Sequence, residues 1–412
     1  MDIKRKIKLA LAAVGPGLFL IGYNIGTGSV TTMAKAGAEY GMSLFWAVVL
    51  SALFTYVLMV AYGKLTIVSG KTALANIKHE FGKIGKPLAL YIFIALVIGE
   101  VMALMGVMGI VVDLIKEGIY IIDPTFGSDN IGIWITLFIT TILYALIWKG
   151  SYKSFEKVLT IFVIIMALSF IVVFILVKPD FSEILNGLIP SIPSNGAMKI
   201  IAAMAGTTCS AAVFIMRSTV VAEKGWSLKD LKIERKDSAV SAIMMLFLSG
   251  VIMAVSAGTL KVMGLQLNET KEMISMFEPI GGKAAAFLLI FGIVGAGIST
   301  VFPIVLIAPW LLSDYNEKPR DIKSPLYRTL TFVALIFAFG MQFMDERPIA
   351  VMIISQAFQT LILPAVVIPA FILLNRKSFI GEYKAKLKEN IGIMAVIIFS
   401  LVTAYFSLAE ML

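Results

Sequence analysis

The chain has 412 residues, of which 59% are hydrophobic and only 15% are charged, with a mean hydropathy of +0.93. Soluble domains carry about 25% charged residues, so this composition excludes a soluble protein. The formal net charge of +9 is concentrated in short loops, as the positive-inside rule requires of a membrane protein, and we therefore expect no nucleic-acid partner.

Apolar stretches recur along the chain, each of about 20 residues, which is the length of helix that crosses a bilayer. We predict eleven transmembrane helices, near residues 9–35, 43–68, 87–115, 131–148, 157–177, 197–222, 238–263, 284–312, 327–344, 349–375 and 390–410. The first apolar run continues into a full span, so we expect no cleavable signal peptide.

The loops between these spans alternate in charge. Segments rich in Lys and Arg lie near residues 4–8, 71–86, 149–157, 224–236, 318–328 and 376–388. The intervening loops are poorer in basic residues, and several are acidic, near residues 117–129, 269–278 and 345–346. With eleven spans all basic segments fall on one side, which predicts a multi-pass protein of the cell (inner) membrane with a cytoplasmic N-terminus and an external C-terminus.

Two spans contain clusters of small and polar residues at mid-membrane depth, Gly22 to Ser29 in the first and Ala205 to Ala212 in the sixth. Glycine disfavours helix by about 1 kcal/mol relative to alanine, so we expect both spans to unwind there. Taken singly, either cluster could instead serve close helix packing. Together they occupy corresponding positions in two five-helix halves, a pattern typical of transporters with inverted repeats.

We therefore predict an all-α membrane protein with helices 1 and 6 broken. The first repeat spans residues 1–178, the inverted second repeat spans 179–388, and an additional helix lies in 389–412. The single Cys209 and single His79 cannot build a zinc site or a Cys–His catalytic set, so we expect no enzyme activity and no cofactor. A membrane-embedded enzyme or a sensor is the remote alternative. The oligomeric state stays open, and a monomer is compatible with the sequence.

Several runs resemble the Nramp family of divalent-metal transporters. They are Gly15-Pro16-Gly17, Ala36-Gly37-Ala38-Glu39-Tyr40-Gly41, Ser69-Gly70-Lys71-Thr72-Ala73-Leu74-Ala75, Ser355-Gln356, Leu363-Pro364, Pro369 and Asn375-Arg376-Lys377. The resemblance touches both halves of the chain. It implies a LeuT-like fold with its substrate between helices 1 and 6.

In that family helix 1 carries Asp-Pro-Gly-Asn and helix 6 carries Met-Pro-His, and the Asp, Asn and Met bind the metal. Counting along the matching segments, these motifs fall on Gly26, Thr27, Gly28 and Ser29, and on Ser210, Ala211 and Ala212. A further helix 6 histidine falls on Arg217, and two acidic positions of helix 3 fall on Val107 and Ile110. The conserved Glu of helix 3 and Gln of helix 10 remain, as Glu100 and Gln356.

The candidate substrate-binding residues are Gly26, Thr27, Gly28, Ser29, Thr207, Cys209, Ser210 and Gln356. As aligned, they offer hydroxyls, backbone carbonyls, an amide and a thiol but no carboxylate, and we assign no metal ligand. Family resemblance implies a divalent cation such as magnesium or manganese, whereas the lost ligands disfavour a transition metal. The alternative substrate is a small anion, carboxylate or amino acid, held by free N–H groups at the half-helix N-termini.

Glu100 and Arg217 are the candidate coupling or gating residues. Glu100 lies about 13 residues into helix 3, near mid-membrane, where a lone carboxylate is costly and a buried cation is the expected partner. We predict that Glu100 faces the bundle interior and pairs with Arg217. Because arginine stays protonated, proton coupling would be absent or would run through Glu100 alone.

Overall fold

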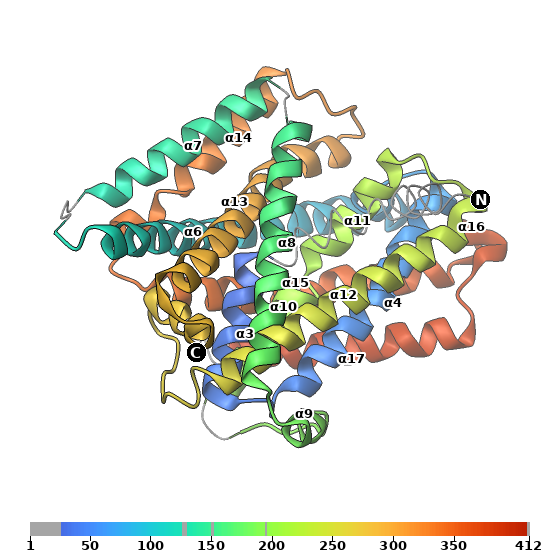
Figure 1. The fold of residues 1–412 in the computed structure, drawn as a ribbon. Helices are drawn as coiled ribbons and strands as arrows, with labels where there is room; N and C mark the ends of the chain where they lie inside the picture. Colours follow the sequence, from blue (N-terminus) through green and yellow to red (C-terminus); the bar gives the residue numbers. More distant parts are fainter. Residues whose placement is uncertain (1–25, 126–129, 150–151, 194–195, 410–412) are drawn as a thin grey trace, which may run out of the picture.

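The computed structural model describes residues 26–125, 130–149, 152–193 and 196–409, and these residues form helices, turns and loops (Figure 1). The helices are α3 (Thr27–Tyr40), α4 (Phe45–Ser69), α5 (Ala73–Glu80), α6 (Gly85–Ile122), α7 (Ile131–Lys149), α8 (Tyr152–Val177), α9 (Phe181–Asn186), α10 (Ala197–Thr208), α11 (Ala211–Glu223), α12 (Leu231–Gly258), α13 (Gly282–Tyr315), α14 (Pro325–Phe337), α15 (Pro348–Asn375), α16 (Lys377–Ile380) and α17 (Leu387–Ala409).

Each predicted span falls mostly on helix where the chain is described, apart from short stretches such as residues 209–210 and 259–263, and the all-α membrane fold is confirmed. In the described part of the chain, eight helical segments are long and apolar enough to cross a membrane, and α8 and α14 contain shorter apolar helices. The count of eleven spans and the repeat boundaries stay predictions. Residues 9–25 of the first predicted span lie outside the described residues.

Local sequence signals set several helix ends. Gly70 ends α4 in the left-handed conformation, with φ of 68°, and its N–H donates to the carbonyl of Thr66. Ser324 caps α14 by accepting a hydrogen bond from the N–H of Tyr327, and Pro325 occupies the first helical position, where a missing N–H costs nothing.

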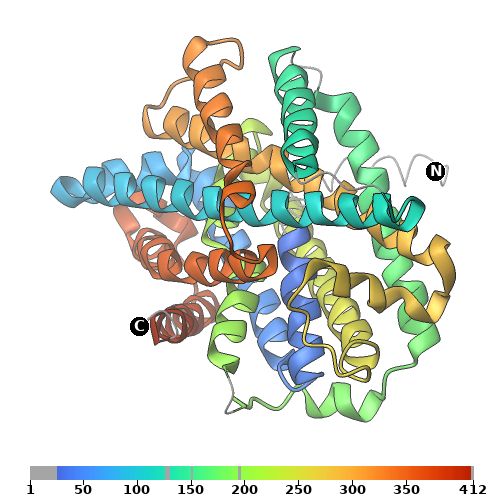
Figure 2. The ribbon, with the colours of Figure 1, turned by 90° about the vertical axis from the view of Figure 1, so that its left-hand side faces the viewer.

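The broken sixth span lies at the centre of the helix bundle. In α10 and α11 together, 89% of the most apolar window is buried, compared with 39% in α17 at the periphery. Helix α6 packs along α13 and α15, and α12 packs along α3 and α4 (Figures 1 and 2). Helices α7 and α14 lie side by side at one edge, where the rings of Tyr144 and Phe332 meet at 5.5 Å.

Ion pairs and hydrogen bonds sort the loops into two groups. One group joins the segments that follow α4, α11, α13 and α15, through Lys71–Glu317, His79–Glu317, Arg320–Glu223, Arg376–Glu80 and Arg235–Glu389. The other group joins the segments around residues 113–123 and 266–283 with α3, through Lys35–Asn268, Thr270–Asp113 and Lys283–Ile121. Among the described loops, the first group thus contains the basic segments 71–86, 224–236, 318–328 and 376–388, and the second contains the acidic segments near residues 117–123 and 269–278.

Candidate functional site

The sixth span is interrupted at the predicted cluster. Helix α10 ends at Thr208 and α11 begins at Ala211, with Cys209 (φ −109°, ψ 51°) and Ser210 (φ −71°, ψ 133°) between them. No side chain caps the start of α11 in this part of the chain. The interruption leaves backbone N–H and C=O groups at two facing helix ends, where they can bind a solute.

Helix α3 begins inside the other predicted cluster. Its N-cap is Gly26, in an extended conformation, and no side chain caps it. The residues before Gly26 lie outside the described part of the chain, so only the second half of the predicted break is seen. The start of α3 and the interruption between α10 and α11 lie against the same cavity.

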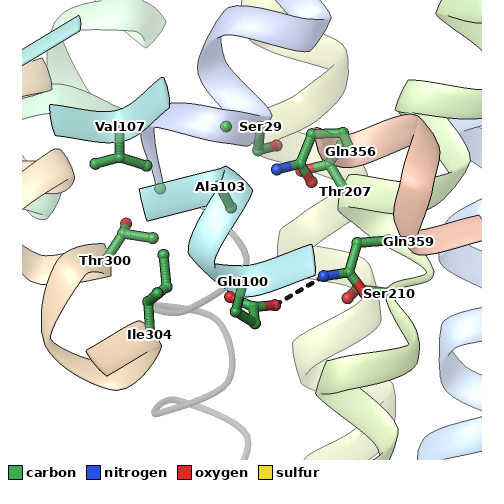
Figure 3. Close-up of a pocket in the computed structure, with 12 residues that line it drawn as sticks. Ser29, Glu100, Ala103, Val107, Thr207, Ser210, Thr300, Ile304, Gln356 and Gln359 are labelled. Atoms are coloured by element: carbon green, nitrogen blue, oxygen red, sulfur yellow. Dashed lines mark hydrogen bonds between the residues drawn. The ribbon is translucent and has the colours of Figure 1, made fainter. Parts of the chain in front are cut away.

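That cavity has a volume of about 40 Å³ and lies where α3, α6, α10, α11, α13 and α15 meet (Figure 3). It is lined by Gly26, Gly28, Ser29, Glu100, Ala103, Val107, Thr207, Ser210, Thr300, Ile304, Gln356 and Gln359. The structure thus brings together six of the eight predicted substrate-binding residues, and Val107 lies at the same cavity.

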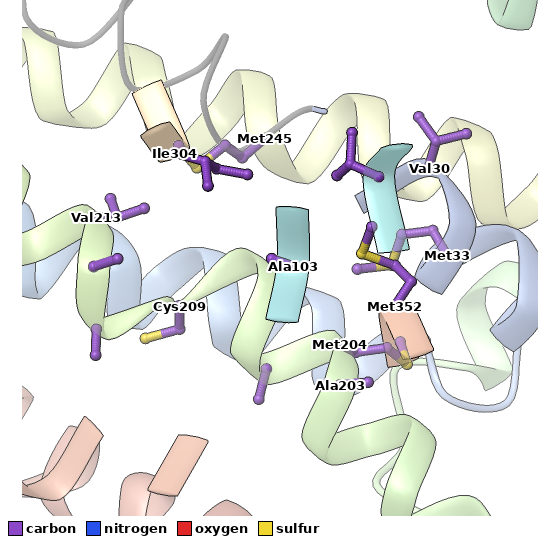
Figure 4. Packing of buried hydrophobic residues seen from close by; sticks show 14 of the residues in the cluster. Val30, Met33, Ala103, Ala203, Met204, Cys209, Val213, Met245, Ile304 and Met352 are labelled. Carbon is purple, nitrogen blue, oxygen red and sulfur yellow. The ribbon is translucent and has the colours of Figure 1, made fainter. Parts of the chain in front are cut away.

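The two others, Thr27 and Cys209, do not line the cavity. Thr27 is buried, and its Oγ1 faces α13, where a Cβ added at Gly297 would lie 2.8 Å away. Cys209 is buried and packs among apolar side chains next to Val213 (Figure 4). A helical break turns its successive residues to different sides, and spacing alone does not tell which side faces the cavity.

Glu100 faces the interior, as predicted, and its carboxylate lines the cavity. The residue is only 4% exposed, and its Oε1 accepts a hydrogen bond from Gln359 Nε2 at 2.9 Å (Figure 3). The expectation of a site without a carboxylate is therefore wrong. The expectation failed because it considered only the positions that align with the family's metal ligands. Such an alignment cannot show that the side chain of a residue on α6 reaches the cavity between the two helix breaks.

The predicted pairing of Glu100 with Arg217 is also wrong. The fully buried guanidinium of Arg217 forms ion pairs with Glu234, at 3.1 Å, and with Asp237. A hydrogen bond to Ser238 Oγ, at 3.2 Å, adds to these contacts. The sequence placed the two acids in a loop before a span starting near residue 238, whereas α12 begins at Leu231 and presents both on one face.

Sequence reasoning missed Gln359 and Thr300. Gln359 lies three residues after Gln356 on α15, hence on the same face of the helix, and that spacing was a usable signal. Thr300 comes from α13, and a Cβ added at Gly26 would overlap its Oγ1. Thr300 therefore fills the space that a side chain at position 26 would need, and no local pattern in α13 indicates this.

The polar groups at the cavity are oxygen and nitrogen donors. The sulfur of Met352 lies next to the cavity, but it accepts a hydrogen bond from Gln356 Nε2 at 3.5 Å, and the side chain packs with Met33 and Met204 (Figure 4). Within the described ranges, no cluster of three or more His, Cys, Asp or Glu side chains could hold a metal ion.

The family model of the Nramp family, described as "Natural resistance-associated macrophage protein-like", matches residues 17–410. The Divalent metal cation transporter MntH of Pectobacterium carotovorum is 23% identical over 403 residues, which cover 96% of this chain and 93% of that protein. The Divalent metal cation transporter MntH of Aeromonas hydrophila is 26% identical over 387 residues, covering 92% and 90%.

Solved structures share the fold. The Eremococcus coleocola manganese transporter superimposes with a TM-score of 0.70 at 16% sequence identity, covering 100% of this chain and 88% of that one. Mhp1, a nucleobase-cation-symport-1 family transporter, gives a TM-score of 0.63 at 12% identity, covering 97% and 93%.

Proposed function

The chain belongs to the Nramp family, and from that premise we propose that it transports a hard divalent cation of the magnesium kind through the cavity lined by Glu100. It is a multi-pass secondary transporter of LeuT-like fold. The curated relatives are named as divalent metal cation transporters, which supports a cation as the substrate.

The charge at the cavity carries this proposal. Among the described residues that line it, Glu100 is the ionisable one. An anionic substrate would depend on the positive charge of Arg217. That charge is already paired with the carboxylates of Glu234 and Asp237. In the described part of the lining there is a carboxylate and no cation, which favours a cation over an anion as the solute, because the Coulomb energy reverses its sign with the charge of the solute.

The donor set favours a hard ion over a transition metal. Magnesium binds oxygen, commonly through one or two carboxylates, and keeps several of its waters. Glu100 would supply the carboxylate, and Ser29, Thr207, Ser210 and Gln356 would hydrogen-bond the retained waters. The cavity of about 40 Å³ has room for roughly three waters, so it fits a partly hydrated ion, while an amino acid would need it to widen.

Uptake into proteoliposomes tests the proposal. Magnesium, manganese, chloride and a mixture of amino acids are offered separately, with internal indicator dyes or radiolabel as readouts. We expect saturable magnesium uptake, weaker manganese uptake, and none of the anions or amino acids. Saturable uptake of an anion or an amino acid without that of any divalent cation would overturn it.

The contact between Gly26 and Thr300 predicts how the site can be converted. We expect Gly26→Asp with Thr300→Gly to bind manganese at least about tenfold more tightly than the wild type, because a second carboxylate then fits beside Glu100. Isothermal titration without chelator measures the affinity, and Thr300→Gly alone is the control. Micromolar manganese binding by the wild type that is lost in Gly28→Trp would contradict the weak-manganese prediction.

The orientation of the protein follows from its two charged ends. We propose that the basic end faces the cytoplasm, with the C-terminus outside. Single cysteines introduced at Asn268 and at Ser324, which belong to opposite groups of loops, should react with an impermeant maleimide from opposite sides. Cys209 is buried and gives little background. Labelling of both positions from one side would contradict the eleven-span count.

A further inference from the structure

A second cavity lies away from the transport site, at the basic end of the bundle. It has a volume of about 200 Å³ and opens between α4, α12, α15 and α17. It is lined by Tyr56, Val57, Val60, Ala61, Lys64, Arg235, Leu374, Lys388, Glu389, Gly392 and Ile393. We propose that this crevice binds one anionic phospholipid, with its phosphate at the basic rim and an acyl chain along the apolar wall.

The rim carries a surplus of positive charge. The lining contains three cationic side chains and one carboxylate, so its net charge is +2. The cations are Lys64, Arg235 and Lys388, and the carboxylate is that of Glu389. Glu389 accepts from Lys64 Nζ at 3.0 Å, from Arg235 at 2.8 Å and from the backbone N–H of Lys386 at 2.9 Å, so its charge is offset within the protein. The surplus charge is available to an anion from outside the protein.

The position of the cations fits a headgroup at the membrane surface. The side chain of Arg235 is 54% exposed and Lys388 is exposed, whereas the side chain of Lys64 is only 9% exposed. Lys388 lies in the first turn of α17, where the helix dipole also favours negative charge, and Arg235 lies in the second turn of α12. Basic pockets between membrane helices on the cytoplasmic side are suited to anionic headgroups.

The rest of the crevice is apolar and lies beside exposed apolar side chains. Below the rim the wall consists of Val57, Val60 and Ala61 from α4 and Gly392 and Ile393 from α17. On the same helices Leu53 is 53% exposed and Ile391 is 61% exposed, as expected of side chains that face acyl chains. A free phosphate ion would use the rim but would leave this wall bare, whereas a phospholipid covers both.

Gly392 keeps the crevice open. A Cβ at this position would lie 3.5 Å from Val57, which is ordinary contact, so the site tolerates a side chain without a clash. A leucine there would extend into the space between α4 and α17. Glycine inside a helix is also disfavoured relative to leucine, so the substitution should not weaken α17.

Native mass spectrometry of the full-length protein in an uncharged detergent tests the site. The probes are phosphatidylglycerol and phosphatidylcholine with the same acyl chains. We expect the wild type to retain one phosphatidylglycerol at activation energies that strip phosphatidylcholine. Arg235→Gln with Lys388→Gln should bind phosphatidylglycerol roughly 25-fold more weakly, since each basic residue contributes roughly fivefold. Glu389 keeps Lys64 as its partner, so this variant should fold.

Two further arms make the result decisive. Lys229→Gln with Lys232→Gln removes two exposed charges from the same end of the molecule, outside the crevice, and should retain the lipid. Gly392→Leu keeps every charge and should lose it. Equal retention of the two lipids, unchanged binding in the Arg235 and Lys388 variant, or displacement of the lipid by millimolar glycerol phosphate would overturn the proposal.

Discussion

Replacing Glu100 with glutamine is expected to lower the apparent affinity for the transported cation by two to three orders of magnitude. At an effective dielectric constant of about 20, a unit charge about 4 Å from a divalent ion contributes several kcal/mol, and the substitution removes it. The shape of the side chain is kept, and a glutamine oxygen can still accept from Gln359 Nε2. Concentration-dependent magnesium uptake into proteoliposomes measures the effect.

Glu117→Gln is the matched control. Glu117 lies on the same helix, α6, but at the acidic end and outside the cavity, so its substitution should leave uptake unchanged. The same vesicles report proton movement through an internal pH dye, and we expect any substrate-driven proton uptake to vanish in Glu100→Gln. Wild-type cation affinity in Glu100→Gln would show that Glu100 does not bind the cation. Proton uptake that survives in Glu100→Gln would show that Glu100 does not carry the coupling.

Replacing Arg217 with methionine should lower the free energy of unfolding by about 3–5 kcal/mol, because it removes the cation that forms ion pairs with the buried carboxylates of Glu234 and Asp237. All three side chains are fully excluded from solvent, so water cannot compensate. Unfolding in mixed micelles with increasing SDS, followed by tryptophan fluorescence, measures the change.

The triple variant Arg217→Met, Glu234→Gln and Asp237→Asn separates charge from packing. It removes the whole buried cluster of charges, and we expect it to recover most of the loss, since neutral replacement of a buried ion group is often tolerated. If the triple variant is as unstable as Arg217→Met, packing rather than the loss of the two ion pairs causes the lower stability. Wild-type stability of the single variant would show that the cluster contributes nothing.

The sequence by itself determined the fold class and the place of the break in the sixth span. Apolar length predicts helices because the bilayer offers backbone groups no hydrogen-bond partners other than their own chain. The cluster around Cys209 and Ser210 predicted the interruption of the sixth span because glycine and threonine lower the cost of unwinding locally. These signals act within a few residues, so they can be read from neighbouring positions.

Only the tertiary structure decided which side chains share the site. Glu100, Thr300 and Gln359 come from three different helices, and their approach depends on helix rotation and packing rather than on local spacing. The ion-pair partner of Arg217 was predicted wrongly for the same reason. Helix α12 begins several residues earlier than predicted, and its first two turns place Glu234 and Asp237, rather than Glu100, beside the guanidinium. A buried charge pairs with the acid that packing places beside it, and that placement is a property of the assembled bundle.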